Sequence, residues 1–197
     1  MNERPIEYSY VFRWLNCSPK NVLDVGTGDS PLPAMMKKCG IPVVRAIDCK
    51  KPKKAYYPVN VFDITKGVLR MKYDVITCIS VLEHIKNYQT AVLNMASMLN
   101  PGGLLIMTFP YNEYKFIPNA YDLPKSRYRW GKNICRQYCA DNLREFEKYR
   151  LKLIDQELWC IFDELYWSCG KRLLKPFKAD NPDIVHHLAC ITMVKEK

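Results

Sequence analysis

The twelve residues VLDVGTGDSPLP, numbered 22 to 33, decide the fold that this sequence predicts. An apolar run ends at Gly26 and Gly28, where glycines let the backbone turn sharply from a strand into a helix and approach a ligand closely. Pro31 stands where a dinucleotide fingerprint has its third glycine, and the carboxylate of Asp29 would repel a diphosphate. The loop therefore favours a ligand without a phosphate group.

Strand-like and helix-like segments alternate outward from this loop. Strands are predicted at residues 21–25, 43–47, 57–61, 73–79 and 104–109, and helices at 31–39 and 88–99. The apolar face of the second helix is predicted to consist of Ala91, Leu93, Met95, Ala96 and Leu99. A further helix is predicted at 141–148, and further strands at 151–159 and 185–194. Continuous apolar strands separated by helices are typical of a parallel sheet covered on both faces, in which ligands bind beyond the carboxyl ends of the strands.

The bulk composition is that of one domain with one core, since the chain has 197 residues and 48% of them are hydrophobic. No long uncharged apolar run and no secretory signal are visible, so we expect a cytoplasmic protein without a membrane span. The nine cysteines form no CxxC pair and are expected to be reduced thiols. No metal is expected, because a zinc site at Cys135, Cys139, His186 and His187 would lack the usual paired spacing.

The net charge of +10 permits a nucleic-acid partner or another anionic partner. The basic residues are spread along the chain, so an ordinary solvated surface is the alternative explanation. Both explanations stay open at this point.

Acidic residues at the strand ends narrow the choice of ligand. Asp48 ends the second predicted strand 20 residues after Gly28, where a carboxylate can accept hydrogen bonds from both hydroxyls of a ribose, although a solvated turn acid is the alternative. Five motifs follow in order: VLDVGTGDS, VVRAIDCK, VNVFDIT, YDVITCISVLEHI and LNPGGLLIMTFPY. Together they resemble the class I (Rossmann-like) S-adenosylmethionine-dependent methyltransferases of the small, single-domain type.

The resemblance implies a fold and a cofactor. The fold is α/β, with a three-layer Rossmann-like architecture: a seven-stranded, mostly parallel sheet, helices on both faces and an antiparallel last strand. The cofactor is S-adenosyl-L-methionine. Its methionine end would lie at Asp24 and the glycine loop, its ribose at Asp48, and its adenine at Cys49 and Asp63. The full set of implied cofactor residues is Asp24, Gly26, Thr27, Gly28, Asp29, Asp48, Cys49, Asp63, Ile64, Ile79, Ser80 and Val81.

Three residues are candidates for a catalytic role. Methyl transfer needs in-line placement of the acceptor, and a hydroxyl acceptor also needs a base. His84 is the first candidate, because imidazole changes its charge near neutral pH; a structural role in the loop is the alternative. Glu83 has the same two alternatives. Tyr111 could line the acceptor pocket or anchor its loop through hydrophobic contacts.

Three segments complete the expected single methyltransferase domain, residues 1–197. Residues 1–20 carry Tyr8, Tyr10, Phe12 and Trp14 on a helix that could cover the site as a lid or simply cover the core. Residues 110–140 form an acceptor-side insertion, and residues 166–184 an irregular basic segment. Candidate acceptor contacts in the insertion are Tyr114, Tyr121, Arg127, Tyr128, Arg129 and Trp130.

The leading functional hypothesis is methyl transfer to an oxygen or nitrogen of a small-molecule or glycan-like acceptor. A nucleic-acid methyltransferase is the second hypothesis; the charge favours it, but the residues after the fourth strand lack the pattern of base-methylating enzymes. A cofactor-binding partner subunit without catalysis is the third. The sequence leaves the acceptor and the oligomeric state open.

Overall fold

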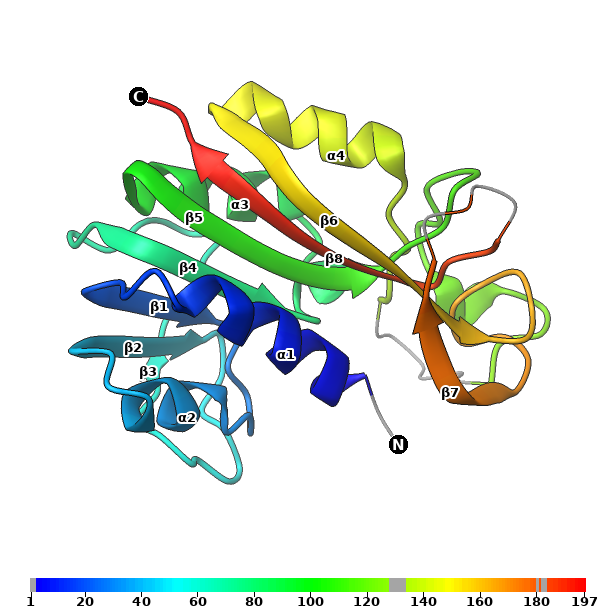
Figure 1. The fold of residues 1–197 in the computed structure, drawn as a ribbon, viewed down its shortest axis with the longest axis horizontal. Helices are drawn as coiled ribbons and strands as arrows, with labels where there is room; N and C mark the ends of the chain where they lie inside the picture. The colour runs from blue at the N-terminus through cyan, green and yellow to red at the C-terminus, as the bar shows by residue number, and fades with distance from the viewer. Residues whose placement is uncertain (1–2, 128–133, 180, 182–183) are drawn as a thin grey trace.

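A central sheet of eight strands organises the computed structural model, which describes residues 3–127, 134–179, 181 and 184–197 (Figure 1). The order of its strands is β3-β2-β1-β4-β5-β8-β6-β7. Their bounds are β1 (Asn21–Val25), β2 (Val43–Asp48), β3 (Asn60–Val61), β4 (Tyr73–Ile79), β5 (Leu99–Pro110), β6 (Leu151–Phe162), β7 (Arg172–Lys178) and β8 (Leu188–Lys195). The expected segments 1–20, 110–140 and 166–184 each include residues outside the described ranges.

The first five strands are parallel, and the C-terminal strands are mixed in direction. β1 pairs in parallel with β2 and β4, and β5 pairs antiparallel with the last strand, β8. β6 pairs antiparallel with both β8 and β7. The predicted Rossmann-like sheet with an antiparallel last strand is therefore confirmed, and it carries one strand more than the seven expected.

The additional strand β7 corrects the expectation of an irregular segment at 166–184, which is wrong for Arg172–Lys178. The sequence did not predict this strand because its composition is basic and because Pro176 lacks the N–H group that a central strand needs. β7 pairs on one side only, because it ends the sheet, so a proline is tolerated there.

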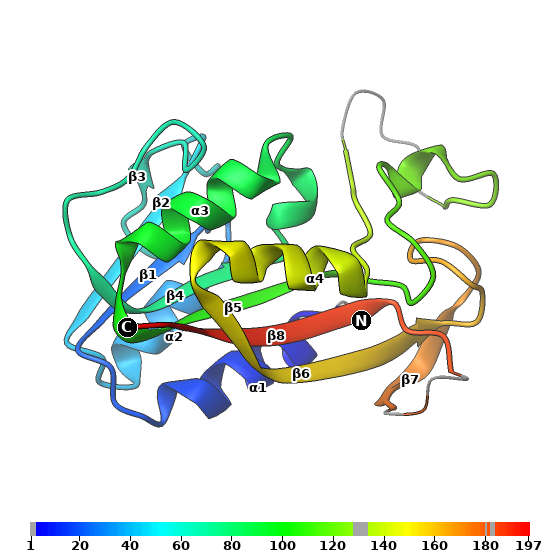
Figure 2. The same ribbon diagram turned by 90° about the horizontal axis from the view of Figure 1, so that it is seen from above.

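Helices cover both faces of the sheet, as Figure 2 shows. α1 (Arg4–Leu15) and α2 (Leu32–Lys38) lie on one face, and α3 (Tyr88–Met98) and α4 (Ala140–Phe146) on the other. Successive residues of a strand point to opposite faces, so Leu105 of β5 belongs to the buried cluster under α3 and α4, and Ile106 to the cluster under α1 and α2. Within the described ranges, no helix combines the length and the hydropathy that crossing a bilayer requires.

α1 covers the sheet. Tyr10, Val11 and Leu15 of this helix are buried in the cluster that also holds α2 residues, whereas Tyr8, Phe12 and Trp14 pack against its margin. None of the described residues that line the pocket below comes from α1. Tyr10, Val11 and Leu15 thus cover the core, and a lid over the site by residues 1–20 stays a prediction.

One of the residues predicted for the apolar face next to α3 is exposed in the structure. Ala91, Met95 and Ala96 of the helix are buried as expected, and so is Leu99 at the start of β5, but Leu93 is 47% exposed, so the expectation for Leu93 is wrong. A helix turns by about 100° per residue, which places Leu93 about 200° from Ala91 and outside the buried stripe. Val92 and Met98 occupy that stripe instead.

We predict that the two neighbouring truncations Met95→Ala and Leu93→Ala differ sharply in stability. Met95 is fully buried, so Met95→Ala should lower the free energy of unfolding by about 2–5 kcal/mol. Leu93→Ala should change it by no more than about 0.5 kcal/mol, as is usual for a surface position. Urea unfolding followed by circular dichroism measures both; equal losses would contradict the packing of α3.

Candidate active site

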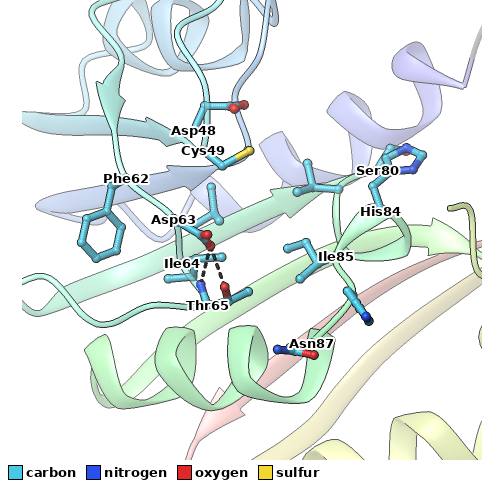
Figure 3. Close-up of a pocket in the computed structure, with 14 residues that line it drawn as sticks. Asp48, Cys49, Phe62, Asp63, Ile64, Thr65, Ser80, His84, Ile85 and Asn87 are labelled. Carbon is cyan, nitrogen blue, oxygen red and sulfur yellow. Dashed lines mark hydrogen bonds between the residues drawn. The ribbon is translucent and has the colours of Figure 1, made fainter. Parts of the chain in front are cut away.

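A pocket of about 460 Å³ opens at the carboxyl ends of β1, β2 and β4, where the strand order reverses (Figure 3). Among the residues that line it are seven of the expected cofactor residues and the expected catalytic residue His84. These seven are Gly26, Asp48, Cys49, Asp63, Ile64, Ser80 and Val81. The other expected residues do not belong to the lining: Asp24, Thr27, Gly28, Asp29, Ile79, Glu83 and Tyr111.

The glycine loop is fixed by its neighbours on both sides. Gly26 has φ = 74°, and a Cβ atom at this position would clash with the side chain of Val81 at the end of β4. The N–H groups of Gly26 and Thr27 both donate to the carbonyl of Ile47 in β2, at 2.8 and 3.1 Å. Gly28 has φ = 52°, and a Cβ atom there would make only an ordinary contact, 4.0 Å from Oδ2 of Asp48. A glycine is therefore required by close packing at 26 and by backbone conformation alone at 28.

Asp24 supports this loop from below. Its carboxylate is buried and accepts hydrogen bonds from the hydroxyls of Thr77, at 2.6 Å, and Thr27, at 2.7 Å. Burial raises the pKa of Asp24 to about 6, and the two hydroxyl donors offset part of that rise. Asp24 thus ties the loop to β4 rather than facing the pocket.

Asp48 presents its carboxylate to the pocket in a fixed orientation. The N–H of Gly28 donates to Oδ2 and the N–H of Lys50 to Oδ1, both at 2.9 Å. A carboxylate has about four acceptor positions, so about two remain for a ligand. Asp29 points elsewhere: its Oδ1 accepts the N–H of Lys54 at 2.9 Å and so holds the loop after β2.

Asp63 and its neighbours form another wall of the pocket, and Figure 3 shows Phe62 on the side away from Ser80 and His84. Oδ1 of Asp63 accepts hydrogen bonds from the hydroxyl and the N–H of Thr65, at 2.7 and 3.0 Å (dashed in Figure 3), and these bonds lower the pKa of Asp63. Cys49 also lines the pocket, and burial raises the pKa of its thiol, which therefore stays protonated at neutral pH.

His84 lies on the short helical turn η1 (Leu82–His84) and is half-exposed. Its Nδ1 atom is 2.6 Å from the carbonyl oxygen of Ile134. A carbonyl only accepts hydrogen bonds, so the proton is assigned to Nδ1 and the lone pair to Nε2. Nε2 lies 3.8 Å from Oε1 of Glu83.

Glu83 is 3% exposed, and its Oε2 atom has no hydrogen-bond partner within the described residues. Burial raises the pKa of this carboxyl to about 8, so it is mostly protonated at pH 7. Glu83 is therefore placed behind the pocket as a neutral group, next to a histidine that keeps a free lone pair.

Tyr111 does not reach the pocket. It is buried, its N–H donates to the carbonyl of His187 at 2.9 Å, and burial raises the pKa of its hydroxyl to about 12. This geometry matches an anchor of the loop after β5.

Tyr114 is exposed, the ring of Tyr121 lies 6.5 Å from that of Trp167, and the N–H of Arg127 donates to Ser168. Tyr128, Arg129 and Trp130 lie outside the described residues.

Sequence reasoning missed Arg4 and Glu7, which α1 brings to the strand ends. A guanidinium nitrogen of Arg4 donates to Glu7, at 3.1 Å, and to the carbonyl of Ile79, at 3.0 Å. The buried carboxylate of Glu7 also accepts hydrogen bonds from the hydroxyls of Ser80 and Thr108. The available signal was spacing: Glu7 precedes the apolar residues Tyr10 and Val11 by three and four positions, which puts a carboxylate on the buried face of the helix.

The two histidines of the conceivable zinc site are occupied by other partners. His187 Nε2 lies 2.7 Å from the carbonyl of Glu164, and Nδ1 accepts the N–H of Ile161. His186 contacts Glu113 and the carbonyl of Ala179. Across the described ranges, no group of three or more His, Cys, Asp or Glu residues is arranged to hold a metal ion.

A Rossmann-like sheet with a glycine loop, an acidic residue at the end of β2 and a pocket at the switch point is the arrangement in which proteins of this fold bind a nucleoside. Residues 8–168 match the family described as "Methyltransferase domain", and the chain belongs to this family. The class and the fold predicted from the five motifs are thereby confirmed.

Among named relatives, the chain is 30% identical over 124 residues to a ubiquinone biosynthesis O-methyltransferase of Coxiella burnetii, which covers 56% of this chain and 52% of that protein. The enzyme of the same name from Marinobacter nauticus is 26% identical over 162 residues, 71% of this chain and 68% of that protein. The chain thus spans about half the length of the Coxiella relative.

A solved structure shows the same fold. The 1,6-didemethyltoxoflavin-N1-methyltransferase of Burkholderia thailandensis, with bound 1,6-didemethyltoxoflavin and S-adenosylhomocysteine, superposes with a TM-score of 0.65 at 15% identity. The match covers 98% of this chain and 78% of that one.

We predict that Glu83→Gln changes how stability depends on pH. The pKa of Glu83 is about 8 in the folded chain and 4.5 in the unfolded chain. The stability that this group contributes is therefore full below pH 4.5, decreases as the pH rises and is lost once the pH has passed 8. Glu83→Gln should therefore flatten the fall in the free energy of unfolding between about pH 5 and 8, the window between the two pKa values. Urea unfolding across this range tests it, with the exposed Glu147→Gln as control; parallel curves for wild type and Glu83→Gln would refute it.

Proposed function

We propose that this chain is an S-adenosylmethionine-dependent methyltransferase that acts on an oxygen or nitrogen of a small-molecule or glycan-like acceptor. The observation that carries this proposal is the position and orientation of the Asp48 carboxylate. Its carboxylate faces the pocket, with both oxygens oriented by backbone N–H groups, directly beside the glycine loop. That arrangement suits two neighbouring ribose hydroxyls.

The rest of the pocket fits the same cofactor. A volume of about 460 Å³ lies within the usual range for small-molecule sites, about 300–1,000 Å³. Phe62 and Ile64 offer apolar surface to an adenine ring, and Asp63 an acceptor for its amino group. No lysine or arginine side chain of the glycine loop is available for a diphosphate, since the loop carries Asp29 instead.

Arg4 supports a place for the methionine end. Its guanidinium is 38% exposed and close enough to Asp24 to lower the pKa of that carboxyl. One nitrogen donates to Glu7 and Ile79, and an arginine has five N–H donors, so others remain for the carboxylate of the ligand. Glu7 fixes the direction of the arginine by pairing with it from the buried side.

When bound, S-adenosylmethionine supplies an electrophilic methyl group on a sulfonium. His84 provides the complementary base: its Nε2 lone pair accepts the proton of an acceptor hydroxyl, while Nδ1–H stays bonded to Ile134. Glu83 is mostly protonated at pH 7 and therefore adds no negative charge beside the imidazole. The loop after β5, within residues 110–140, is the segment to which we assign the acceptor contacts.

The charge of +10 is the observation that favours a nucleic-acid acceptor, and it remains a second candidate. The named small-molecule relatives support the first candidate. A partner subunit without catalysis would have no need for an oriented Asp48 and an oriented His84 in the same pocket.

We predict that Asp48→Ala weakens binding of S-adenosylhomocysteine. The substitution removes the carboxylate acceptors and leaves the N–H of Gly28 unpaired, so the dissociation constant should rise about 10- to 100-fold, given about 1.5–3 kcal/mol for hydrogen bonds to a charged group. Titration calorimetry measures it. Asp155→Ala, which removes an ion pair with Arg13 and does not alter the lining of the pocket, should leave the affinity unchanged. Wild-type affinity in Asp48→Ala would remove the residue from the site.

We predict that His84→Ala lowers turnover more than cofactor affinity. A positioned base contributes about 10²–10⁴-fold to rate, so transfer to a hydroxyl acceptor should fall within that range while S-adenosylhomocysteine affinity changes little. The acceptor is first found by incubating the wild type with radiolabelled S-adenosylmethionine and fractionated cell extract. Label in small molecules or glycans is expected, and label in RNA would favour the second candidate. An unaltered rate in His84→Ala would exclude it as the base.

A further inference from the structure

Residues 134–138 run beside the segment that carries His84. The carbonyl of Ile134 accepts from His84 Nδ1 at 2.6 Å, and the hydroxyl of Tyr138 donates to the carbonyl of Leu82 at 2.9 Å. Between them, the N–H of Arg136 donates to the carbonyl of Glu83 at 3.1 Å. Every second residue of 134–138 thus makes a hydrogen bond to the η1 segment, about 50 residues earlier in the chain.

The side chain of Arg136 extends this contact beyond η1. Its guanidinium donates to the carbonyl of Ile85 at 2.8 Å and to that of Lys86 at 3.2 Å. It also lies over the ring of Tyr88, with 5.7 Å from Cζ to the centroid. Arg136 therefore contacts three successive parts of the chain: η1, the turn after it and the first residue of α3.

The electrostatics of Arg136 indicate a geometric role. The residue is 9% exposed, and in the described part of the chain no carboxylate lies within ion-pair distance of it. A buried guanidinium whose donors go to backbone carbonyls is satisfied by its fixed, planar set of N–H groups. A lysine ammonium carries its donors on a single nitrogen and lacks the planar fork with which the guanidinium bonds these carbonyls from two nitrogens.

The pocket depends on the segment that Arg136 binds. His84, Ile85 and Lys86 all line it. At the other end, residues 134–138 are anchored to the end of β5, since the N–H of Tyr138 donates to the carbonyl of Pro110 at 2.9 Å and its carbonyl accepts from Asn112 at 3.0 Å. The insertion after β5 and the wall of the cofactor pocket are therefore one hydrogen-bonded unit.

We propose that Arg136 is a positioning residue for His84: by holding residues 134–138 against the η1 segment, it keeps the Ile134 carbonyl on Nδ1 and so keeps the Nε2 lone pair facing the pocket. The kinetic consequence rests on the proposed function of His84 as a base. The tautomer of His84 does not, and it can be measured in the absence of any acceptor.

The test uses the three histidines of the chain. In ¹⁵N-histidine-labelled protein, long-range ¹H–¹⁵N spectra report which ring nitrogen carries the proton. Wild type should show the Nδ1–H form for His84 and the Nε2–H form for His187, whose Nε2 faces the Glu164 carbonyl and whose Nδ1 accepts the N–H of Ile161. In Arg136→Lys, His84 should shift to a mixture of tautomers while His187 keeps its form.

His187 separates a local effect from loss of the fold. If Arg136→Lys disturbs both histidines, the milder Tyr138→Phe, which removes only the hydroxyl bond to Leu82, replaces it and should still move the His84 signals alone. Arg144→Lys is the matched control, because Arg144 is exposed and pairs only with Asp141 among the described residues. If Arg136→Lys folds and the tautomer of His84 is unchanged, the proposal is overturned. The same conclusion follows if Tyr138→Phe has to replace Arg136→Lys and the tautomer of His84 is unchanged in Tyr138→Phe.

Kinetics then connect the tautomer to catalysis. Arg136→Lys should lower kcat by about tenfold or more, a part of the about 10²–10⁴-fold that a positioned base supplies, with a smaller change in KM for S-adenosylmethionine. In a His84→Ala background the same substitution should have no further effect on kcat. A tautomer shift without loss of kcat would refute the role of His84 as the base and leave the positioning role standing. An additive loss in the double variant would show that Arg136 acts on the reaction by another route.

Discussion

No side chain fits at position 26, and the arrangement of the pocket depends on that constraint. Gly26 passes the end of β4 so closely that a Cβ atom would clash with Val81, and its N–H bonds to Ile47 at the end of β2. Three strand ends therefore meet at one residue. Because Asp48 follows Ile47 directly, the contact that fixes the loop also fixes the carboxylate that faces the pocket.

Three buried acids lie around this junction, and they differ in their hydrogen-bond partners. Glu7 receives hydrogen bonds from two hydroxyls and a guanidinium. Asp24 receives two hydroxyl bonds, which leave its pKa at about 6, and Glu83 lacks a partner at Oε2, so its pKa rises to about 8. Desolvation favours the neutral form of a carboxyl, and each added donor opposes it. At neutral pH, Asp24 is therefore mostly charged and Glu83 mostly neutral.

The sequence predicted those parts of the fold and site that short-range patterns encode. The strands at 21–25 and 73–79 agree with β1 and β4 because apolar runs there end at glycine or polar residues. Asp48 and Asp63 were found because parallel strands bring their carboxyl ends to one edge. β7 was missed, since an edge strand need not be apolar, and Arg4 was missed because its role depends on where α1 crosses the sheet. Leu93 shows the remaining error: an apolar residue counts toward a helix face only if its angle agrees.

The assignment of His84 shows most clearly where local patterns end. The motif around it predicts that an imidazole stands beside the pocket, and nothing in that motif predicts which ring nitrogen carries the proton. The carbonyl of Ile134, 50 residues later in the chain, accepts a hydrogen bond from Nδ1 and so places the proton on that nitrogen. Arg136 and Tyr138 hold this carbonyl in place. The N-terminal motifs therefore build the cofactor half of the pocket, while the insertion after β5 sets the chemical state of the histidine. A substitution in this insertion can therefore alter the setting of His84 from a segment separate from the glycine loop, as loops on a rigid scaffold do.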